Sequence, residues 1–334
     1  MSYTACRSVL ATAIFCAVGV SPVVQAQSNV TLFGLVDASV GRFQAPGGTS
    51  ITAVESGKMT TSNWGIRGSE DLGGGLKASF SIESFFRADV GAVGRFNGDP
   101  MFTRSAWVGL SGGFGSVNLG RNTTSLFQNV LRFNAFGDSF GFSPSIRHYF
   151  SSNTATGDTG WSDSIKYVSP NFGGLFVTLH AAAKEADGGY NKGASATYSG
   201  GPLGLSATWQ KVEKSATVND TDTWSLGSSY DFKVIRVFAQ YGEVDNDTVV
   251  NTFKISGLGA SVPIGAGSAL LQWGQVKPDT GAKRDTLSVG YDYFLSKRTD
   301  VYAVFMNDKL SGVSAGKNYG LGIRHRKNRQ AQHS

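Results

Sequence analysis

Polar and apolar residues alternate along much of this chain with a period of two. The alternation is complete from Leu76 to Glu83, where apolar residues alternate with Lys, Ser, Ser and Glu. Similar patterns occupy 30–40, 223–230, 234–241 and 299–306. Because successive side chains of a strand point to opposite faces, these patterns predict many strands with one apolar and one polar face. Helical periodicity is scarce, and after Ala26 no run of about 18 apolar residues could form a membrane-spanning helix.

The connections between these segments alternate between short and long. Seven are tight and rich in Gly or Pro, at 71–75, 112–115, 170–174, 200–203, 231–234, 263–268 and 296–299. Eight are longer and more polar, at 44–58, 89–99, 122–160, 186–190, 214–220, 245–248, 278–283 and 310–316. This rhythm predicts sixteen antiparallel strands, each long enough to cross the hydrocarbon layer when tilted.

The fold class that we predict is all-β, a 16-stranded antiparallel transmembrane β-barrel with short periplasmic turns and long extracellular loops. Lipid offers no hydrogen-bond partners, so the sheet must close on itself and leave no open edge. Only every second residue then faces lipid, which agrees with a mean hydropathy of −0.11. A soluble β-sandwich is the alternative, although such domains seldom keep a short and long rhythm over so many strands.

The N-terminus carries a secretory signal. A weakly positive start precedes the apolar run Ser8–Val20, and Val24–Ala26 is a small-residue cleavage site. Both cysteines, Cys6 and Cys16, lie within the signal, so the mature chain has no thiol, which suits an exported protein. We therefore expect a signal peptide at 1–26, a barrel at 27–326 and an atypical basic tail at 327–334.

The composition excludes several kinds of chemistry. Four His and two Cys without ligand spacing argue against metal clusters and disulfides, and we predict no cofactor. The net charge of +6 is spread along the chain, which argues against a nucleic-acid partner. Gly109–Gly113 fits the G-x-S-x-G pattern but lies at a strand-to-strand turn, and Asp245–Asp247 offers too few ligands for calcium. The chain is predicted not to be an enzyme.

Segments throughout the chain match one family in order. They include Val30–Asp37, the hairpin Trp64–Ala78, Arg104–Leu110, 114–121, 167–172, the turn region Leu295–Tyr302 and 322–326. In these segments the chain resembles the general porins of Gram-negative outer membranes, in their β-proteobacterial and neisserial branch. The resemblance implies an outer-membrane diffusion channel for small hydrophilic solutes and ions. It also implies a homotrimer whose third loop, here 122–160, folds into the lumen.

The same resemblance implies contacts with outer-membrane lipid, lipopolysaccharide and the barrel assembly machinery. Members of the family commonly end with a Phe directly after the His-Arg pair, which serves as an assembly signal. Here the chain continues from Lys327 to Ser334 with polar and basic residues, so we expect less efficient assembly. A barrel with an adhesin or structural role and no open pore is the alternative function.

Side-chain parity predicts which charges line the pore. Trp64 and Ile66 are expected to face lipid, and Arg67 lies on the other side of the same strand, so Arg67 faces the lumen. On the next strand Lys77 and Glu83 face the lumen for the same reason. The family segments add Arg104 and Arg121, and the third loop adds further candidates, Arg132, Arg147, Asp138 and Asp158. A rim position without effect on conductance is the alternative for each arginine. Because the wall candidates are mostly basic, we expect a weakly anion-preferring pore.

Overall fold

The computed structural model describes residues 29–152, 154, 159–183, 190–213 and 220–327. The expected signal peptide at 1–26 and the tail beyond Lys327 lie outside the described residues, as do most of the connections expected at 186–190 and 214–220. Among the described residues, no helix is long and apolar enough to span a membrane.

Eighteen strand segments make up the fold in the described residues. They are β1 (Asn29–Phe43), β2 (Ile51–Ser56), β3 (Asn63–Gly73), β4 (Leu76–Arg87), β5 (Ala92–Val93), β6 (Ser105–Gly112), β7 (Gly115–Thr123), β8 (Gly160–Val168), β9 (Leu175–Ala182), β10 (Asn191–Gly200), β11 (Leu203–Val212), β12 (Thr221–Asp231), β13 (Arg236–Asn246), β14 (Asn251–Ile264), β15 (Gly267–Pro278), β16 (Arg284–Phe294), β17 (Thr299–Leu310) and β18 (Gly316–Lys327).

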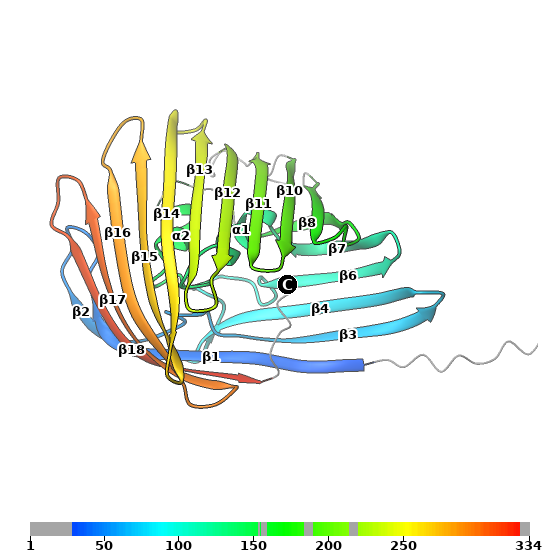
Figure 1. Ribbon diagram of the computed structural model, residues 1–334, viewed down its shortest axis with the longest axis horizontal. Coiled ribbons are helices and arrows are strands. Elements are labelled where there is room, and N and C mark those ends of the chain that lie inside the picture. Colours follow the sequence, from blue (N-terminus) through cyan, green and yellow to red (C-terminus); the bar gives the residue numbers. More distant parts are fainter. Residues whose placement is uncertain (1–28, 153, 155–158, 184–189, 214–219, 328–334) are drawn as a thin grey trace, which may run out of the picture.

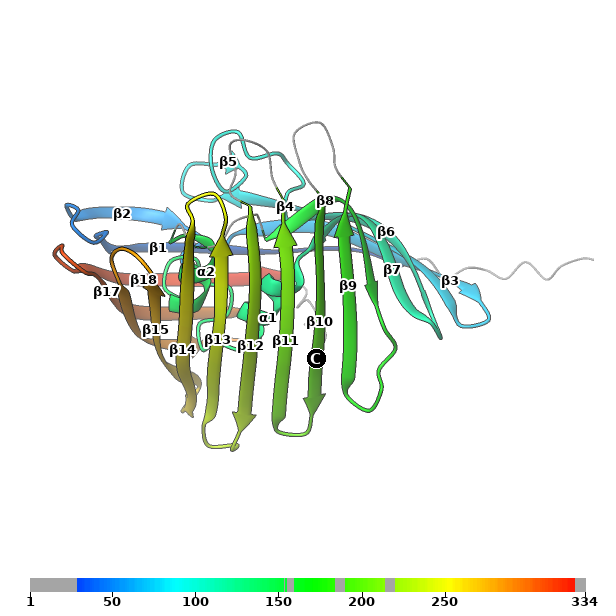
Figure 2. The same cartoon turned by 90° about the horizontal axis from the view of Figure 1, so that it is seen from above.

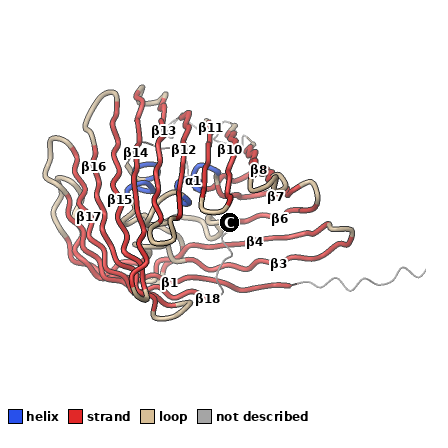
Figure 3. The backbone as a smooth tube through the Cα atoms, in the orientation of Figure 1, coloured by secondary structure: helices blue, strands red, loops and turns tan. Residues whose placement is uncertain are grey.

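These segments form one closed barrel, which Figures 1 and 3 show from the same side. Each strand pairs antiparallel with its neighbour in the sequence, and β1 pairs with β18 to close the sheet. The first half of β1 pairs with β3 and its second half with β2, so β2 and β3 share one position in the wall. Among the described strands, β5 pairs only with the end of β4, and it belongs to a loop. The described segments therefore give the sixteen wall strands that were predicted.

The two faces of the sheet differ as the alternation predicted. On β1 the inward Asp37 is fully buried, whereas the neighbouring Val36 is 45% exposed on the outside. β4 repeats this pattern, because Glu83 is buried inside and Ile82 is exposed outside. Large apolar side chains thus cover the outer face, where lipid replaces water, and polar side chains cover most of the inner face.

The seven tight turns lie where they were predicted, and side chains next to them hydrogen-bond the turn backbone. In the β3–β4 turn Gly73 to Gly75 have positive φ, and Gly73 N donates to Asp71 Oδ1 at 2.9 Å. In the β12–β13 turn Lys233 N donates to Asp231 Oδ1 at 2.7 Å. Local side-chain acceptors of this kind stabilise short connections between antiparallel strands.

The long connection between β7 and β8 contains two helices, α1 (Ser125–Arg132) and α2 (Pro144–Phe150), which the alternation analysis did not predict. Thr124 and Ser143 cap them, each accepting a hydrogen bond from the backbone N–H three residues later. α1 packs against β10, β11 and β12, and α2 packs against β14, β15 and β16. Figure 2 shows both helices within the curve of the sheet. We refer to the described residues between Thr123 and Gly160 as the internal loop.

The apolar core lies between the internal loop and the wall rather than at the centre of the barrel. One cluster joins Phe136 and Phe142 of the loop to Met306 and neighbouring wall residues. A second cluster joins Leu126 and Ile146 of the two helices to residues of β13, β14 and β15. Burial of these side chains attaches the loop to one side of the barrel and leaves the strands from β3 to β7 facing it across the lumen.

Candidate functional site: the lumen and its internal loop

Glycines on the inner wall make room for the internal loop. A Cβ at Gly227 would overlap the ring of Phe133 and would lie 2.7 Å from Asn129 Oδ1. A Cβ at Gly274 would lie 2.8 Å from Pro144 Cβ. The inward glycines that the loop covers on β11–β16 and β18 are Gly204, Gly227, Gly242, Gly257, Gly259, Gly274, Gly290 and Gly320. Because glycine has no side chain, the loop backbone can lie close to the wall at these positions.

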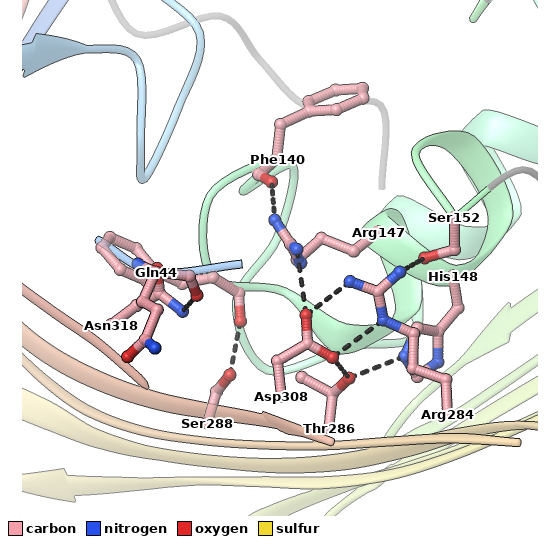
Figure 4. A network of polar contacts seen from close by, with 11 residues as sticks. Gln44, Phe140, Arg147, His148, Ser152, Arg284, Thr286, Ser288, Asp308 and Asn318 are labelled. Carbon is pink, nitrogen blue, oxygen red and sulfur yellow. Dashed lines mark hydrogen bonds and ion pairs between the residues drawn. The ribbon is translucent and has the colours of Figure 1, made fainter. Parts of the chain in front are cut away.

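A charged network fixes α2 to the wall (Figure 4). Asp308 on β17 accepts from Arg284 Nε at 2.8 Å and forms an ion pair with Arg147 of α2 at 3.2 Å. Thr286 donates to the same carboxylate at 3.0 Å and lies 2.9 Å from His148 Nε2. One buried carboxylate therefore neutralises charge from both the wall and the loop, so the loop position depends on Asp308.

A second network lies on the neighbouring strands β1, β16, β17 and β18. Asp37 accepts from the backbone N–H groups of Met59 and Thr60, at 2.8 and 2.6 Å, and from the Tyr302 hydroxyl at 2.7 Å. Arg324 donates to Asp300 Oδ2 at 2.6 Å and also pairs with Asp292. These contacts leave each carboxylate with strong hydrogen-bond donors, so their negative charge is largely compensated within the wall.

The predicted loop carboxylate Asp138 joins this second network. Thr60 Oγ1 donates to Asp138 Oδ1 at 3.0 Å and accepts from Arg324 at 3.1 Å. Ser139 Oγ donates to Lys58 O at 2.7 Å, which ties the loop to the segment between β2 and β3. Asp138 is therefore held at the junction of the internal loop with the wall, rather than projecting alone toward the opposite side.

Arg67, Lys77, Glu83 and Arg104 lie on the wall that faces the loop. Arg67 points inward, with its guanidinium 5.1 Å from the ring centroid of Phe33. Lys77 is inward and exposed near the β3–β4 turn. Arg104 Nε donates to Glu83 Oε2 at 2.8 Å, and Ser81 Oγ donates to Glu83 Oε1. The structure thus brings Glu83 and Arg104 together as an ion pair, while Arg67 and Lys77 form no ion pair with them among the described residues.

Arg121 lies at the rim instead of with these wall residues. It is opposite Ala106, on the outward side of β6 and β7, next to a β-bulge between Gly120 and Asn122. Its guanidinium donates to Thr103 O at 2.6 Å and to Ser162 Oγ at 3.0 Å. The bulge changes the alternation locally, so the sequence alone could not show which way Arg121 points.

Arg132 occupies the last turn of α1 and donates to Ser199 Oγ at 2.9 Å. Arg236, which the sequence analysis did not select, donates to Ser229 Oγ at 3.1 Å and lies 5.2 Å from the ring centroid of Phe238. Burial, together with repulsion from Arg236, lowers the pKa of Arg132 from its ordinary value. The two guanidinium groups therefore add positive charge to the same part of the lumen.

Other polar residues that position the loop were also missed. Lys166 Nζ donates to Thr123 O at 2.8 Å and to Gln128 Oε1 at 3.0 Å, which fixes the start of the loop. The further missed residues are Asp37, Arg284, Asp292, Asp300, Asp308 and Arg324. Parity in 299–306 places Asp300 on the opposite side from Val301 and would have indicated its inward position. No local pattern specifies its partner, because Asp300 and Arg324 are 24 residues apart.

The internal loop should become less stable in acid because of His148. The pKa of His148 is lowered from 6.5 to about 3, mainly because the side chain is buried. Repulsion from Arg284 and Arg147 adds to this shift, and attraction to Asp308 and Asp285 opposes it. Below pH 6.5 the detached loop binds a proton that the docked loop does not, so docking weakens as the pH falls toward 3, by at most about 1.4 kcal/mol per pH unit.

Amide hydrogen exchange of α2, measured from pH 7 to 4 and corrected for intrinsic rates, would test this prediction. We expect the opening free energy to fall with pH in the wild type and to change much less in His148→Asn, which cannot take up the proton. A wild-type profile as flat as that of the variant would contradict the assignment to His148.

A closed antiparallel sheet with an apolar outer face, a polar inner wall and a loop inside it defines a passive channel of the bacterial outer membrane. The chain belongs to the Gram-negative porin family, whose sequence profile matches residues 11–312. Porins are channels and not enzymes, and the described residues contain no group of three or more His, Cys, Asp or Glu side chains that could hold a metal ion.

Relatives match over nearly their whole length. Outer membrane porin protein 32 of Delftia acidovorans is 32% identical, over 96% of this chain and 99% of the relative. An outer membrane porin protein of Bordetella pertussis is 28% identical over the same shares. Major outer membrane protein P.IB of Neisseria meningitidis serogroup B is 26% identical, over 91% of this chain and 96% of the relative.

Solved structures show the same architecture. The anion-selective porin from Comamonas acidovorans superposes with a TM-score of 0.77 and 30% identity, covering 90% of this chain and all of the other. A loop-deletion mutant of OmpT from Vibrio cholerae has a TM-score of 0.71 at 14% identity, covering 90% of this chain and 99% of the other. The second likeness concerns the fold alone.

Proposed function

We propose that this porin passes small hydrophilic solutes and ions passively and weakly prefers anions. The main support for the proposal is that carboxylates in the lumen are bound by nearby donors, whereas two arginines in the lumen form no ion pair. Asp37, Asp300 and Asp308 are held by guanidinium, hydroxyl or backbone donors. In the part of the chain that the structure describes, Arg67 and Arg236 form no ion pair and contact aromatic rings or a serine hydroxyl. The uncompensated charge is therefore positive, which lowers the energy of an anion in the lumen.

The proposed pore-lining residues are Arg67, Lys77, Glu83, Arg104, Arg132 and Asp138. Arg67 contributes a charge that forms no ion pair among the described residues, whereas the charge of Arg104 is offset by Glu83. Arg121, at the rim, would act on entering ions more weakly because salt screens exposed charges over about 8 Å. The similarity to a porin named as anion-selective gives independent support.

Removal of the uncompensated arginines should weaken the anion preference. In a potassium chloride gradient across a planar bilayer, we expect the wild-type reversal potential to indicate a chloride permeability above that of potassium. In Arg67→Gln/Arg236→Gln the permeability ratio should fall by about two-fold toward unity, because a lumen charge changes local ion concentrations. Arg42→Gln removes one charge from the outward face and should leave the ratio unchanged. A cation-selective wild type would refute the proposal.

We further propose a homotrimer assembled by the barrel assembly machinery and surrounded by outer-membrane lipid and lipopolysaccharide. Membership of the porin family and the exposed apolar outer face support these partners. The proposed domain organisation is a signal peptide at 1–26, a barrel at 27–326 and a basic tail at 327–334. Chemical cross-linking of detergent-extracted protein would test the trimer, with a monomer as the contradicting result.

A further inference from the structure

The long connection between β4 and β6 contains an asparagine directly followed by a glycine. Asn97–Gly98 is the only Asn-Gly step in the sequence. Asp99 N donates a hydrogen bond to Phe96 O at 3.2 Å, so the step occupies the two central positions of a tight turn. Gly98 has a φ of +87°, which glycine adopts without strain, and both residues of the step are exposed.

This turn is fixed at its base and open at its tip. Arg95 binds Asp99 Oδ2 through its backbone N–H and through Nε, both at 2.8 Å. A Cβ built at Gly98 would meet no heavy atom beyond its chain neighbours within 4 Å. Among the described residues, Gly98 N donates no hydrogen bond. The backbone nitrogen of Gly98 is therefore not blocked by a side chain, by a neighbouring segment or by a hydrogen bond.

Arg87 contacts the side chain of the same asparagine. Its Nη2 donates to Asn97 Oδ1 at 2.8 Å. Arg87 ends β4 and lies on the same side of this strand as the buried, inward-facing Glu83 and Phe85, because alternate residues share a face. Within the part of the chain that the structure describes, Arg87 forms no ion pair. It is thus a positive charge at the long-loop end of the inner wall, and its side-chain partner is a neutral amide.

We propose that Asn97 loses its side-chain amide spontaneously and becomes an aspartate that forms an ion pair with Arg87. Gly98 N gives its proton to solvent and attacks Asn97 Cγ. The new N–Cγ bond closes a succinimide ring, the Cγ–Nδ2 bond breaks, and Nδ2 takes a proton from water and leaves as ammonia. Water then adds to one of the ring carbonyls and opens the ring to aspartate or isoaspartate. The net reaction consumes one water and releases one ammonia, without oxidation or reduction.

Two features of the turn favour this reaction. Glycine has no Cβ, so its nitrogen can approach the asparagine side chain and its backbone can rotate as the ring closes. The guanidinium of Arg87 donates to Asn97 Oδ1, the oxygen on which negative charge develops during the attack. A hydrogen-bond donor at such an oxygen stabilises the transition state.

The conversion changes the charge at the mouth of the pore. It adds one negative charge beside Arg87, on the inner side of the wall. Because positive charge in the lumen favours anions, aged molecules should prefer anions less than freshly folded ones. The covalent change is independent of the proposed function, whereas its effect on ions rests on the proposed anion preference.

Peptide mass spectrometry of the full-length folded protein, incubated in detergent at mildly alkaline pH, would test the conversion. We expect Asn97 to deamidate at least about tenfold faster than the exposed Asn171, because Asn171 is followed by Phe172, whose side chain hinders ring closure. Incubation in heavy-oxygen water should place one heavy oxygen in the product. Arg87→Met should slow the conversion about threefold, since the donor to Oδ1 is lost.

Reversal potentials in a potassium chloride gradient would test the charge effect. Asn97→Asp should lower the chloride-to-potassium permeability ratio by about 1.5-fold. Incubation should lower the ratio in the wild type but not in Asn97→Gln, whose longer side chain would have to close a larger and less favourable ring.

Deamidation of Asn97 no faster than that of Asn171 would overturn the site. Equal rates in the wild type and Arg87→Met would exclude the guanidinium from the reaction, and equal permeability ratios in the wild type and Asn97→Asp would overturn the charge effect. A freshly folded wild type that prefers cations would refute the proposed function and leave the mass-spectrometric result intact.

Discussion

Asp308→Asn is expected to detach α2 from the barrel wall. Arg147 and Arg284, which are partly buried, would keep their positive charges while losing the buried carboxylate that both of them contact. Removal of one partner of a buried ion pair costs about 3–5 kcal/mol, because the remaining charge is left uncompensated. Amide hydrogen exchange in Pro144–Phe150 should therefore accelerate by about 100-fold or more. Single-channel recordings should also show larger current fluctuations, since the loop lies beside the ion pathway.

Asp285→Asn is the matched control. Asp285 belongs to the same strand as Arg284, but it faces outward and pairs with Lys283 at 3.2 Å in an exposed position. An exposed pair contributes about 0–1 kcal/mol, so exchange in α2 should stay close to that of the wild type. If Asp308→Asn and Asp285→Asn gave the same exchange rates, Asp308 would not be the residue that fixes the loop.

Gly227→Leu is expected to push the end of α1 away from the wall and into the lumen. Even a Cβ at this position would overlap Phe133, which is 1% exposed and packed between β11 and β12. Overpacking of a well-packed contact costs about 1–3 kcal/mol, and the loop is the part that can move. Because displacement is toward the free lumen, single-channel conductance should fall by roughly half.

Two further variants define the test of Gly227. Gly227→Ala adds only the Cβ and should give a smaller change in the same direction, which remains measurable if the leucine variant does not fold. Ser228→Leu adds a large side chain to the outward face of the same strand and should leave the conductance unchanged. Wild-type conductance in a folded Gly227→Leu protein would exclude close docking of the loop at this glycine.

Some of the site could be predicted from local patterns and some could not. Arg67, Lys77 and Glu83 were placed inward by parity, and their strands have the predicted register. The two helices were not predicted, although Thr124 and the Ser143–Pro144 pair are helix-start signals. A period of two indicates strands only, so residues 122–160, which lack it, were predicted as a loop. Arg121 could not be placed, because the bulge at Gly120 changes the direction of the chain locally.

The sequence by itself determined that this protein is a closed barrel of sixteen wall strands in the described chain. Alternation and turn rhythm are local, and a sheet in lipid has no stable form other than a closed one. Only the tertiary structure decided where the internal loop docks and which charges remain uncompensated. Arg147 and Asp308 are 161 residues apart, and the glycines under the loop come from seven different strands. Such contacts depend on how the whole barrel brings distant strands together, which no local period specifies.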